Sequence, residues 1–260
     1  MGERTLIAGI LNVNPDSFSD GGTYLDIDNA VKYAKHMLEA GADIIDIGGE
    51  STRPGYEPVS IEVELSRVLP VIKRLREETK AVISIDTQKA EVARQALIAG
   101  AHIVNDILGL QGDPDMARVV AEFSAGIIVM HNSKTGEYTD VIQDMKDFFS
   151  RSLQLAAETG IDESRIVLDP GIGFAKTFEN NIDILSRLEE LNSFGLPVLL
   201  GTSRKRFIGT ILDKPVLERL EGSLATAVLG IAKGVDILRV HDVEEIKRAT
   251  KVTDVIIRRN

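Results

Sequence analysis

The sequence predicts an α/β protein folded as a (β/α)₈ barrel, the TIM barrel fold, in a single domain over residues 1–260. Short β-branched runs alternate with longer helical patterns from end to end, and the runs are continuously apolar. Continuous apolar runs are typical of parallel strands that helices cover on both faces. Eight strand-and-helix units in about 250 residues are the usual size of such a barrel. No stretch rich in Pro, Ser and Gly divides the chain.

Eight segments have the composition of buried strands. In chain order they are residues 5–13, 43–49, 81–87, 102–107, 126–131, 165–171, 197–203 and 236–242. Helical patterns are clearest over residues 30–40, 61–78, 90–99, 116–123 and 221–234. At the junctions EAGADIIDI, IAGAHIVNDI and AKGVDILRVHD, we expect a glycine to end the helix before the next strand begins.

An open, doubly wound sheet is the alternative fold. Such a sheet usually has fewer strands and carries a glycine-rich fingerprint after the first one. Here the first strand ends in NVNPDSF, which has no such fingerprint. The sequence therefore favours the closed barrel.

Composition excludes several classes of function. The chain has 30 Lys and Arg against 40 Asp and Glu, a net charge of -10, which disfavours a nucleic-acid partner. It has no cysteine, so disulfides, thiolate metal sites and cysteine nucleophiles are excluded. The start of the chain lacks a signal-peptide pattern, and no apolar run approaches membrane-spanning length. We therefore expect a cytoplasmic protein with neither a nucleic-acid nor a membrane partner.

Polar residues stand at the end of every predicted strand, where a barrel places its active site. They are Asn12, Asn14, Glu50, Thr52, Arg53, Asp86, Asn105, Asp106, His131, Asp169, Ser203, Arg204, Lys205, Arg239 and His241. Helix capping accounts for any one of these polar residues. It explains poorly why all eight strand ends are polar, or why three of them are cationic in an acidic protein.

Three of these residues, Asp86, Asn105 and Asp169, lie in apolar frames. A buried carboxylate is costly unless it finds hydrogen-bond donors. Two carboxylates and an amide at one mouth suit a flat heterocycle rich in donors, such as the edge of an amino-oxo-pyrimidine. General acid and base catalysis, as in glycoside hydrolysis, is the alternative, and both remain open on the residues alone.

The cations indicate a different ligand. Lys205 with Arg204, and Arg239 with His241, follow the last two strands, where barrels often bind phosphate. A solvated charge cluster is the alternative for SRKR. His131 is equally compatible with lining a site and with packing.

The motifs ILNVNPDSFSDGG, GGESTRPG, SIDT, VNDI, LDPGIGF, GTSRKRFIG and RVHD, in this order and spacing, resemble the dihydropteroate synthase family over almost the full length. The resemblance implies a (β/α)₈ barrel that forms a homodimer. It also implies an alkyl-transferring enzyme of folate synthesis. The expected reaction condenses (7,8-dihydropterin-6-yl)methyl diphosphate with 4-aminobenzoate and gives 7,8-dihydropteroate and diphosphate.

The resemblance also assigns roles to residues. Asp86, Asn105, Asp169 and Lys205 would hold the pterin ring, with Thr52 in the same substrate site. Arg239 and His241 would bind the diphosphate, and Asn12 would bind Mg²⁺. Asp86, Lys205, Arg239 and His241 would be catalytic. The 4-aminobenzoate pocket would be formed by Phe18, Arg53, Pro54, Phe174 and Arg206.

Within this resemblance, the loop after Asn12 is expected to be a mobile lid that brings Phe18 over the aminobenzoate ring. Three departures from the common family motifs stand out: Asn14 replaces a threonine, MHNSKTGEY replaces MHMQGTP, and Arg206 replaces a serine. Two related possibilities remain. A pterin-binding methyltransferase domain has no use for STRPG or SRKRFIG, and a catalytically idle paralogue would not be expected to keep workable residues at every mapped position.

Overall fold

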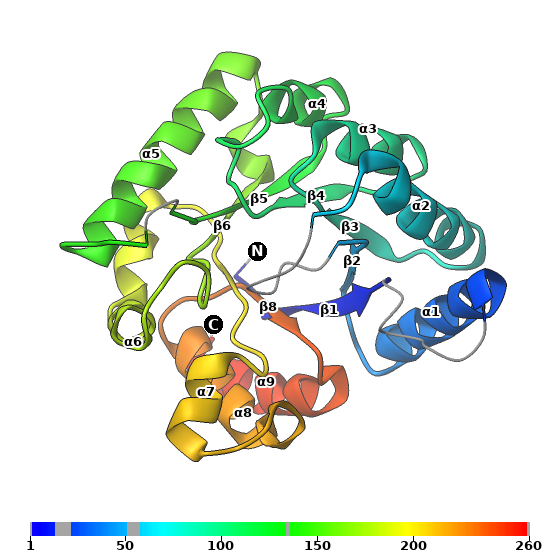
Figure 1. Ribbon diagram of the computed structural model, residues 1–260. Coiled ribbons are helices and arrows are strands. Elements are labelled where there is room, and N and C mark those ends of the chain that lie inside the picture. Colours follow the sequence, from blue (N-terminus) through cyan, green and yellow to red (C-terminus); the bar gives the residue numbers. More distant parts are fainter. Residues whose placement is uncertain (1, 14–21, 51–57, 134–135, 259–260) are drawn as a thin grey trace.

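The computed structural model describes residues 2–13, 22–50, 58–133 and 136–258. Eight parallel strands form a ring with helices around it (Figure 1). The strands are β1 Leu6–Asn12, β2 Ile44–Gly48, β3 Val82–Asp86, β4 Ile103–Asp106, β5 Gly126–Met130, β6 Ile166–Asp169, β7 Leu199–Leu200 and β8 Ile237–Val240. Their order in the sheet is β6-β5-β4-β3-β2-β1-β8-β7. A parallel bridge between Leu168 and Val198 joins the two ends of the sheet. The predicted (β/α)₈ barrel is confirmed.

Helices follow the strands and cover the outside of the ring. They are α1 Gly22–Glu39, α2 Ile61–Glu78, α3 Ala90–Ile98, α4 Met116–Glu122, α5 Val141–Thr159, α6 Phe178–Ser186, α7 Arg206–Leu212, α8 Leu220–Ala232 and α9 Val243–Ile257. Short 3₁₀ turns occur at η2 Glu163–Arg165, η3 Leu188–Phe194 and η4 Val216–Glu218. None of the helices in the described ranges is long and apolar enough to cross a membrane.

Local sequence sets the ends of these helices. The Asp140 carboxylate accepts a hydrogen bond from the backbone N–H of Ile142 at 2.9 Å and begins α5, and Gly160 ends it with φ 82°. Gly41, Gly100 and Gly234 lie just after α1, α3 and α8 with φ of 105°, 109° and 97°. This left-handed conformation costs a glycine little, because it has no Cβ. The three predicted glycine ends are confirmed.

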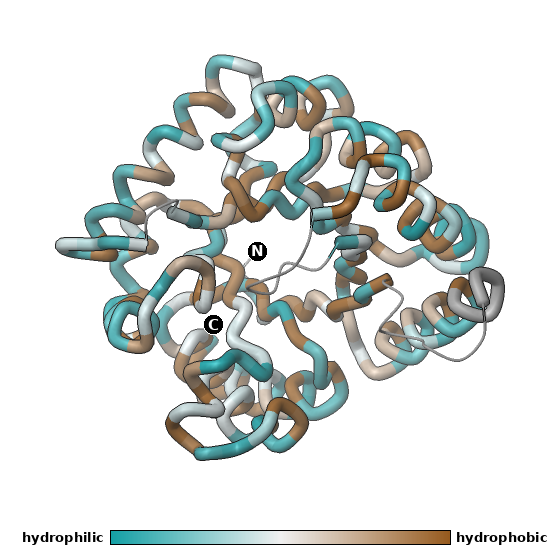
Figure 2. The backbone as a smooth tube through the Cα atoms, viewed as in Figure 1, coloured by the Kyte–Doolittle hydropathy of each residue, from teal (hydrophilic) through white to brown (hydrophobic). Residues whose placement is uncertain are grey.

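Two apolar layers hold the barrel together. The larger layer fills the space between the strands and the helices, and the hydropathy-coloured backbone shows the apolar strands at its centre (Figure 2). The smaller layer consists of Ala8, Ile44, Ile128, Val167, Leu199 and Ile237, with Leu6 and Ile103 packed against it. These residues come from seven different strands, so they fill the inside of the barrel towards its amino end.

Candidate active site

The polar residues of the barrel mouth follow from the alternation of side chains along the strands. Residues two positions apart on a strand face the same side. Asp46, Asn105, Asp169 and Arg239 each lie two positions after an apolar residue that fills the barrel or packs against that filling. They therefore form the next layer of the interior, at the carboxyl ends of the strands. This end is where barrels carry their active sites.

Arg239 connects two of the carboxylates across this layer. Its Nε donates to Asp46 Oδ2, and its Nη2 donates to Asp86 Oδ2, each at 2.6 Å. Asn105 Nδ2 also donates to Asp46 Oδ2, at 3.2 Å. Asp46 is only 1% exposed and Asp86 8% exposed, so both carboxylates depend on these donors. The amide oxygen of Asn105 is buried and has no hydrogen-bond partner among the described residues, which leaves an acceptor for a ligand.

Asp46 was missed by the sequence analysis. It lies in the apolar frame of the second strand, DIIDIGG, as Asp86 lies in SIDT, and the same reasoning would have found it. Its position in the middle of the strand hides it from a search restricted to strand ends. In the barrel, the Asp46 carboxylate on β2 pairs with the Arg239 guanidinium on β8.

Burial changes the proton affinities of this cluster. Burial raises the pKa of Asp86 to about 7, although the charge of Arg239 opposes this shift. Burial, together with the charge of Arg239, lowers the pKa of Lys205 to about 8. Desolvation also raises the pKa of Asp169 above its ordinary value. Perturbed groups that share one mouth are typical of functional sites.

The loop after β6 places Asp169 and Phe174. The Asp169 Oδ1 atom accepts a hydrogen bond from the N–H of Gly171 at 2.7 Å. Gly171 has φ 65°, and a Cβ at this position would lie 2.1 Å from the carbonyl oxygen of His131, so the turn requires glycine. Further along the loop, the Phe174 ring lies with its centre 4.3 Å from Lys205 Nζ, a cation–π contact. Asp169, Phe174 and Lys205 thus belong to one wall of the mouth.

His241 follows β8, close to the same cations. Its Nδ1 lies 3.0 Å from Ser203 Oγ. Burial, followed by the charges of Arg204 and Arg239, lowers its pKa to about 4. Arg204 itself is paired with Asp242 and ties the loop after β7 to the loop after β8. Its guanidinium is therefore already occupied by a carboxylate.

Asn12 ends β1 beside this cluster. A methyl group at Gly48 would lie 3.7 Å from Asn12 Oδ1 and 3.8 Å from Asp86 Oδ2. The described ranges contain no group of three His, Cys, Asp or Glu residues arranged for a metal. Mg²⁺ commonly takes one or two protein oxygens and completes its shell with phosphate oxygens and water. The single amide oxygen of Asn12 fits the protein share of such a shell.

Other predicted site residues are placed elsewhere or not described. Arg206 is exposed at the first position of α7, and no ion pair joins it to the parts of the chain that the structure describes. Phe18, Thr52, Arg53 and Pro54 lie outside the described residues, and so does the predicted lid. His131 is fully buried, and its ring makes an edge contact with Phe148 at 5.1 Å. Packing therefore accounts for His131.

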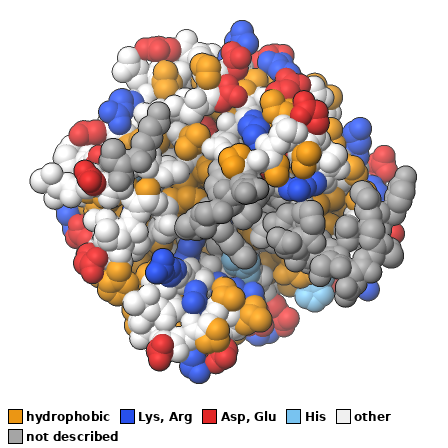
Figure 3. All heavy atoms as spheres, viewed as in Figure 1, with side chains coloured by type: hydrophobic (Ala, Val, Ile, Leu, Met, Phe, Trp, Pro, Cys, Tyr) orange, Lys and Arg blue, Asp and Glu red, His pale blue; other side chains and the backbone are white. Residues whose placement is uncertain are grey.

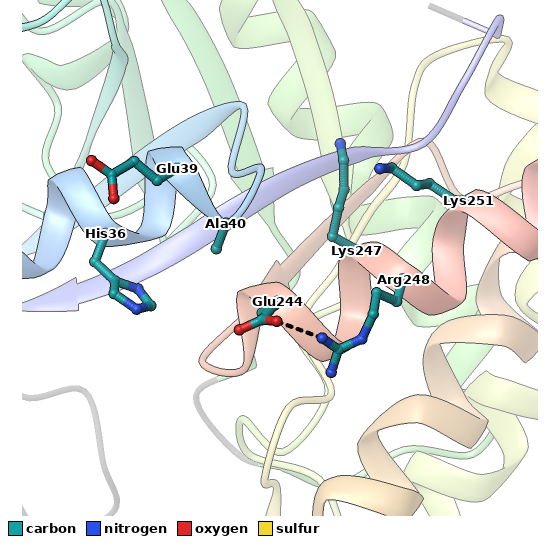
Figure 4. A pocket seen from close by; sticks show the side chains of 7 residues that line it. All are labelled: His36, Glu39, Ala40, Glu244, Lys247, Arg248 and Lys251. Atoms are coloured by element: carbon teal, nitrogen blue, oxygen red, sulfur yellow. Dashed lines mark hydrogen bonds and ion pairs between the residues drawn. The ribbon is translucent and has the colours of Figure 1, made fainter.

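A separate hollow of about 380 Å³ lies between α1 and α9. Figure 4 shows the seven residues that line it: His36, Glu39, Ala40, Glu244, Lys247, Arg248 and Lys251. Arg248 is paired with Glu244, and Lys247 Nζ lies 3.4 Å from Asp43 Oδ2. The hollow contains none of the predicted site residues.

Comparison with known proteins identifies the family of this chain. The family model described as "Pterin binding enzyme" matches residues 8–241. A dihydropteroate synthase from Clostridium beijerinckii is 52% identical over 260 residues, covering 100% of this chain and 97% of its own length. The chain belongs to the dihydropteroate synthase family. The predicted family and enzyme class, a transferase of an alkyl group, are thereby confirmed.

Solved structures support the same family. A Clostridium difficile dihydropteroate synthase with pteroic acid has a TM-score of 0.98 and 52% identity, covering 99% of this chain and 98% of its own. A Xanthomonas albilineans dihydropteroate synthase with 4-aminobenzoic acid has a TM-score of 0.93 and 41% identity, covering 97% of this chain and 93% of its own. These relatives favour the synthase over the pterin-binding methyltransferase alternative.

Proposed function

We propose that the barrel mouth carries out the dihydropteroate synthase reaction with the residues described above. The observation that carries this proposal is the joining of Asp86 and Asp46 by Arg239, with Asp169, Asn105 and Lys205 at the same mouth. The site offers acceptors for the amino and ring N–H groups of a pterin. It also offers cations for a diphosphate.

The pterin ring would bind deepest in the mouth. Asp169 accepts from the amino group and ring N–H of the pyrimidine, a charge-assisted pairing. The unpaired amide oxygen of Asn105 and the ammonium of Lys205 provide a further acceptor and a donor. Asp86 stabilises positive charge that develops on the pterin methylene carbon. Burial strengthens each of these interactions, because little water competes for them.

The diphosphate would bind at Arg239 and His241. The positive charge of Arg239 stabilises the leaving group as the methylene C–O bond breaks, and His241, whose pKa is lowered to about 4, contributes a neutral imidazole. We assign Mg²⁺ to Asn12, where it would neutralise charge on the diphosphate oxygens when bound. The amine nitrogen of 4-aminobenzoate then forms the new C–N bond and releases one proton. This sequence needs no covalent bond to the enzyme.

The aminobenzoate would bind next to Phe174, whose ring lies against Lys205. Arg206 is exposed close by in the chain, and the pairing of its guanidinium with the benzoate carboxylate stays a prediction. The contributions of Phe18, Thr52, Arg53 and Pro54 also stay predictions.

The experiment that tests these assignments separates the two halves of the pterin substrate. Calorimetry measures the affinity for 6-hydroxymethyl-7,8-dihydropterin, which has no phosphate, and for inorganic diphosphate with Mg²⁺. Asp169→Asn is expected to weaken the pterin at least 10-fold with little change for diphosphate, because the amide leaves a mismatched group. Arg239→Met is expected to weaken diphosphate more than the pterin. Equal losses for both ligands in both variants would contradict the assignments.

We also propose that the chain forms a homodimer through α7, η4, α8 and α9. Exposed apolar side chains gather on these elements, and Figure 3 shows hydrophobic side chains on the surface over α7 and α8. They are Ile211, Leu212, Val216, Leu217, Val228, Leu229, Val252, Val255, Ile256 and Ile257, each at least 40% exposed. Large exposed apolar patches mark sites of association.

The single domain, the cytoplasmic location and the lack of a nucleic-acid partner stay predictions.

A further inference from the structure

Arg219 makes contacts that the reaction does not explain. It lies between η4 and α8, half-buried, and it forms no ion pair within the described parts of the chain. Its guanidinium donates instead to backbone carbonyl groups. Nη1 lies 3.1 Å from the carbonyl oxygen of Arg204 and 3.3 Å from that of Lys205. Nε lies 3.0 Å from the carbonyl oxygen of Lys214.

These carbonyl groups flank α7 on both sides. Arg204 and Lys205 come directly before the helix, and Lys214 comes two residues after its end. A guanidinium presents its donors in a fixed planar fork, so a single side chain can fix the distance between the two ends of the segment. Hydrogen bonds from a charged donor are stronger than those between neutral groups.

The middle of α7 is shaped to receive this guanidinium. Gly209 is buried, and a Cβ at this position would lie 2.2–2.4 Å from Nη2, Cζ and Nε of Arg219. Glycine is unfavourable inside a helix relative to alanine, so a packing requirement accounts for its presence. The guanidinium therefore lies against the helix backbone itself.

The segment held in this way carries a strained residue beside Lys205. Arg204 has φ 58°, which is uncommon for a residue with a side chain. Its N–H donates to Ser223 Oγ at 3.0 Å, and Ser223 Oγ donates to the carbonyl oxygen of Arg219 at 2.8 Å. Contacts from α8 thus stabilise the turn that directs Lys205 towards Phe174 and the mouth.

We propose that Arg219 is a positioning residue that sets Lys205 through the backbone of the α7 segment, with Gly209 as the required space for its guanidinium. The inference rests on the proposed role of Lys205 in binding the pterin. Arg219 itself touches no substrate.

Two independent substitutions test this proposal. Arg219→Met removes the donors and keeps most of the side-chain volume. Gly209→Ala keeps the donors and displaces them, because the new methyl group takes the place of the guanidinium. Both are expected to lower kcat/KM for the pterin diphosphate about 10-fold. Arg94→Met is the matched control: Arg94, on α3, is also half-buried and pairs with Glu122 on α4, and a change within twofold is expected.

The helix itself makes Gly209→Ala informative. Alanine in place of a helical glycine normally stabilises a protein, but here its methyl group displaces the guanidinium, so a merely structural role predicts a lower Tm with unchanged kinetics. The proposal instead predicts a loss of activity without a fall in Tm of comparable severity. Arg219→Lys, which cannot reach both ends of α7, is expected to restore less than half of the lost kcat/KM.

The double variant decides whether the two residues act together. Without the guanidinium, the alanine methyl has room, so Arg219→Met with Gly209→Ala is expected to match Arg219→Met alone within twofold. Independent effects would multiply to about 100-fold and overturn the proposal, as would a Gly209→Ala enzyme with wild-type kcat/KM. An unaltered chain that forms no dihydropteroate in the same assay would instead contradict the proposed function.

Discussion

The guanidinium of Arg239 and the carboxylate of Asp86 lie 2.6 Å apart, joining β8 to β3 through the inside of the barrel. Arg239 is the main charge partner of Asp86, whereas Arg239 itself interacts most strongly with Asp46 and next with Asp86. A diphosphate that binds Arg239 competes with these carboxylates for the cation. Diphosphate binding is therefore expected to weaken the pairing of Arg239 with both carboxylates.

Asp46→Asn tests this competition. The variant removes a negative charge from beside Arg239, so the free energy of unfolding is expected to fall by about 1–3 kcal/mol. Inorganic diphosphate then replaces the missing countercharge, and its affinity is expected to rise about fivefold. Denaturant unfolding and calorimetry measure the two quantities.

The control for Asp46→Asn is Glu122→Gln, which breaks an exposed pair with Arg94 and is expected to cost less than about 0.5 kcal/mol. A lower diphosphate affinity in Asp46→Asn would show that Asp46 is needed to orient Arg239 for the ligand. That result would contradict the competition between diphosphate and the carboxylates for Arg239.

Phe174→Leu tests the aminobenzoate wall. Leucine keeps an apolar surface but loses the face that contacts the Lys205 ammonium, so the KM for 4-aminobenzoate is expected to rise about fivefold. Affinity for 6-hydroxymethyl-7,8-dihydropterin should change less than twofold. Phe178→Leu is the control, since Phe178 is 39% exposed at the start of α6. Equal effects of the two variants would remove Phe174 from the pocket.

The fold follows from the sequence more completely than the site does. Continuous apolar runs and glycines at helix ends are local signals, and they predicted all eight strands and three helix ends. Asp46 lies in an apolar frame that the sequence shows, but its partner Arg239 is 193 residues away, and no local pattern marks that contact. Nor does a local pattern mark the contacts of Arg219 with the carbonyl groups of Arg204 and Lys205. His131 shows a different limit: its strand-end position left lining a site and packing equally open, and only the structure shows its ring packed in the core.

His131 is expected to make the protein sensitive to acid. Burial lowers its pKa from 6.5 to about 4, and its Nε2 lies 2.8 Å from Asp144 Oδ1. A depressed folded-state pKa contributes stability above pH 6.5 that is lost as the pH falls towards 4. The loss attributable to this residue is about 3 kcal/mol.

His131→Leu replaces the titratable ring by an apolar side chain of similar size in the core. Urea unfolding at pH 7, 5.5 and 4.5 is expected to show a shallower fall in stability than for the unaltered chain. His241, whose pKa is also lowered to about 4, should leave part of the slope in place. A slope identical to that of the unaltered chain would assign the acid sensitivity to other groups.

Introducing a negative charge on the proposed dimer face tests whether that face joins two copies of the chain. Leu217 and Val255 are 75% and 70% exposed on η4 and α9, and aspartate at either position is expected to prevent association. Light scattering should then report a monomer. Ile98→Asp is the control, because Ile98 is 63% exposed on α3. Dimers that persist in both face variants would place the interface elsewhere.

The most direct test of the proposed reaction is to identify its products. The chain is incubated with (7,8-dihydropterin-6-yl)methyl diphosphate, 4-aminobenzoate and Mg²⁺, and the products are separated and quantified over time. We predict 7,8-dihydropteroate and diphosphate in equal amounts, with formation of both reduced at least 100-fold in Arg239→Met. Diphosphate released with hydroxymethyl-dihydropterin and without dihydropteroate, or no turnover at all, would contradict the reaction assigned to this barrel mouth.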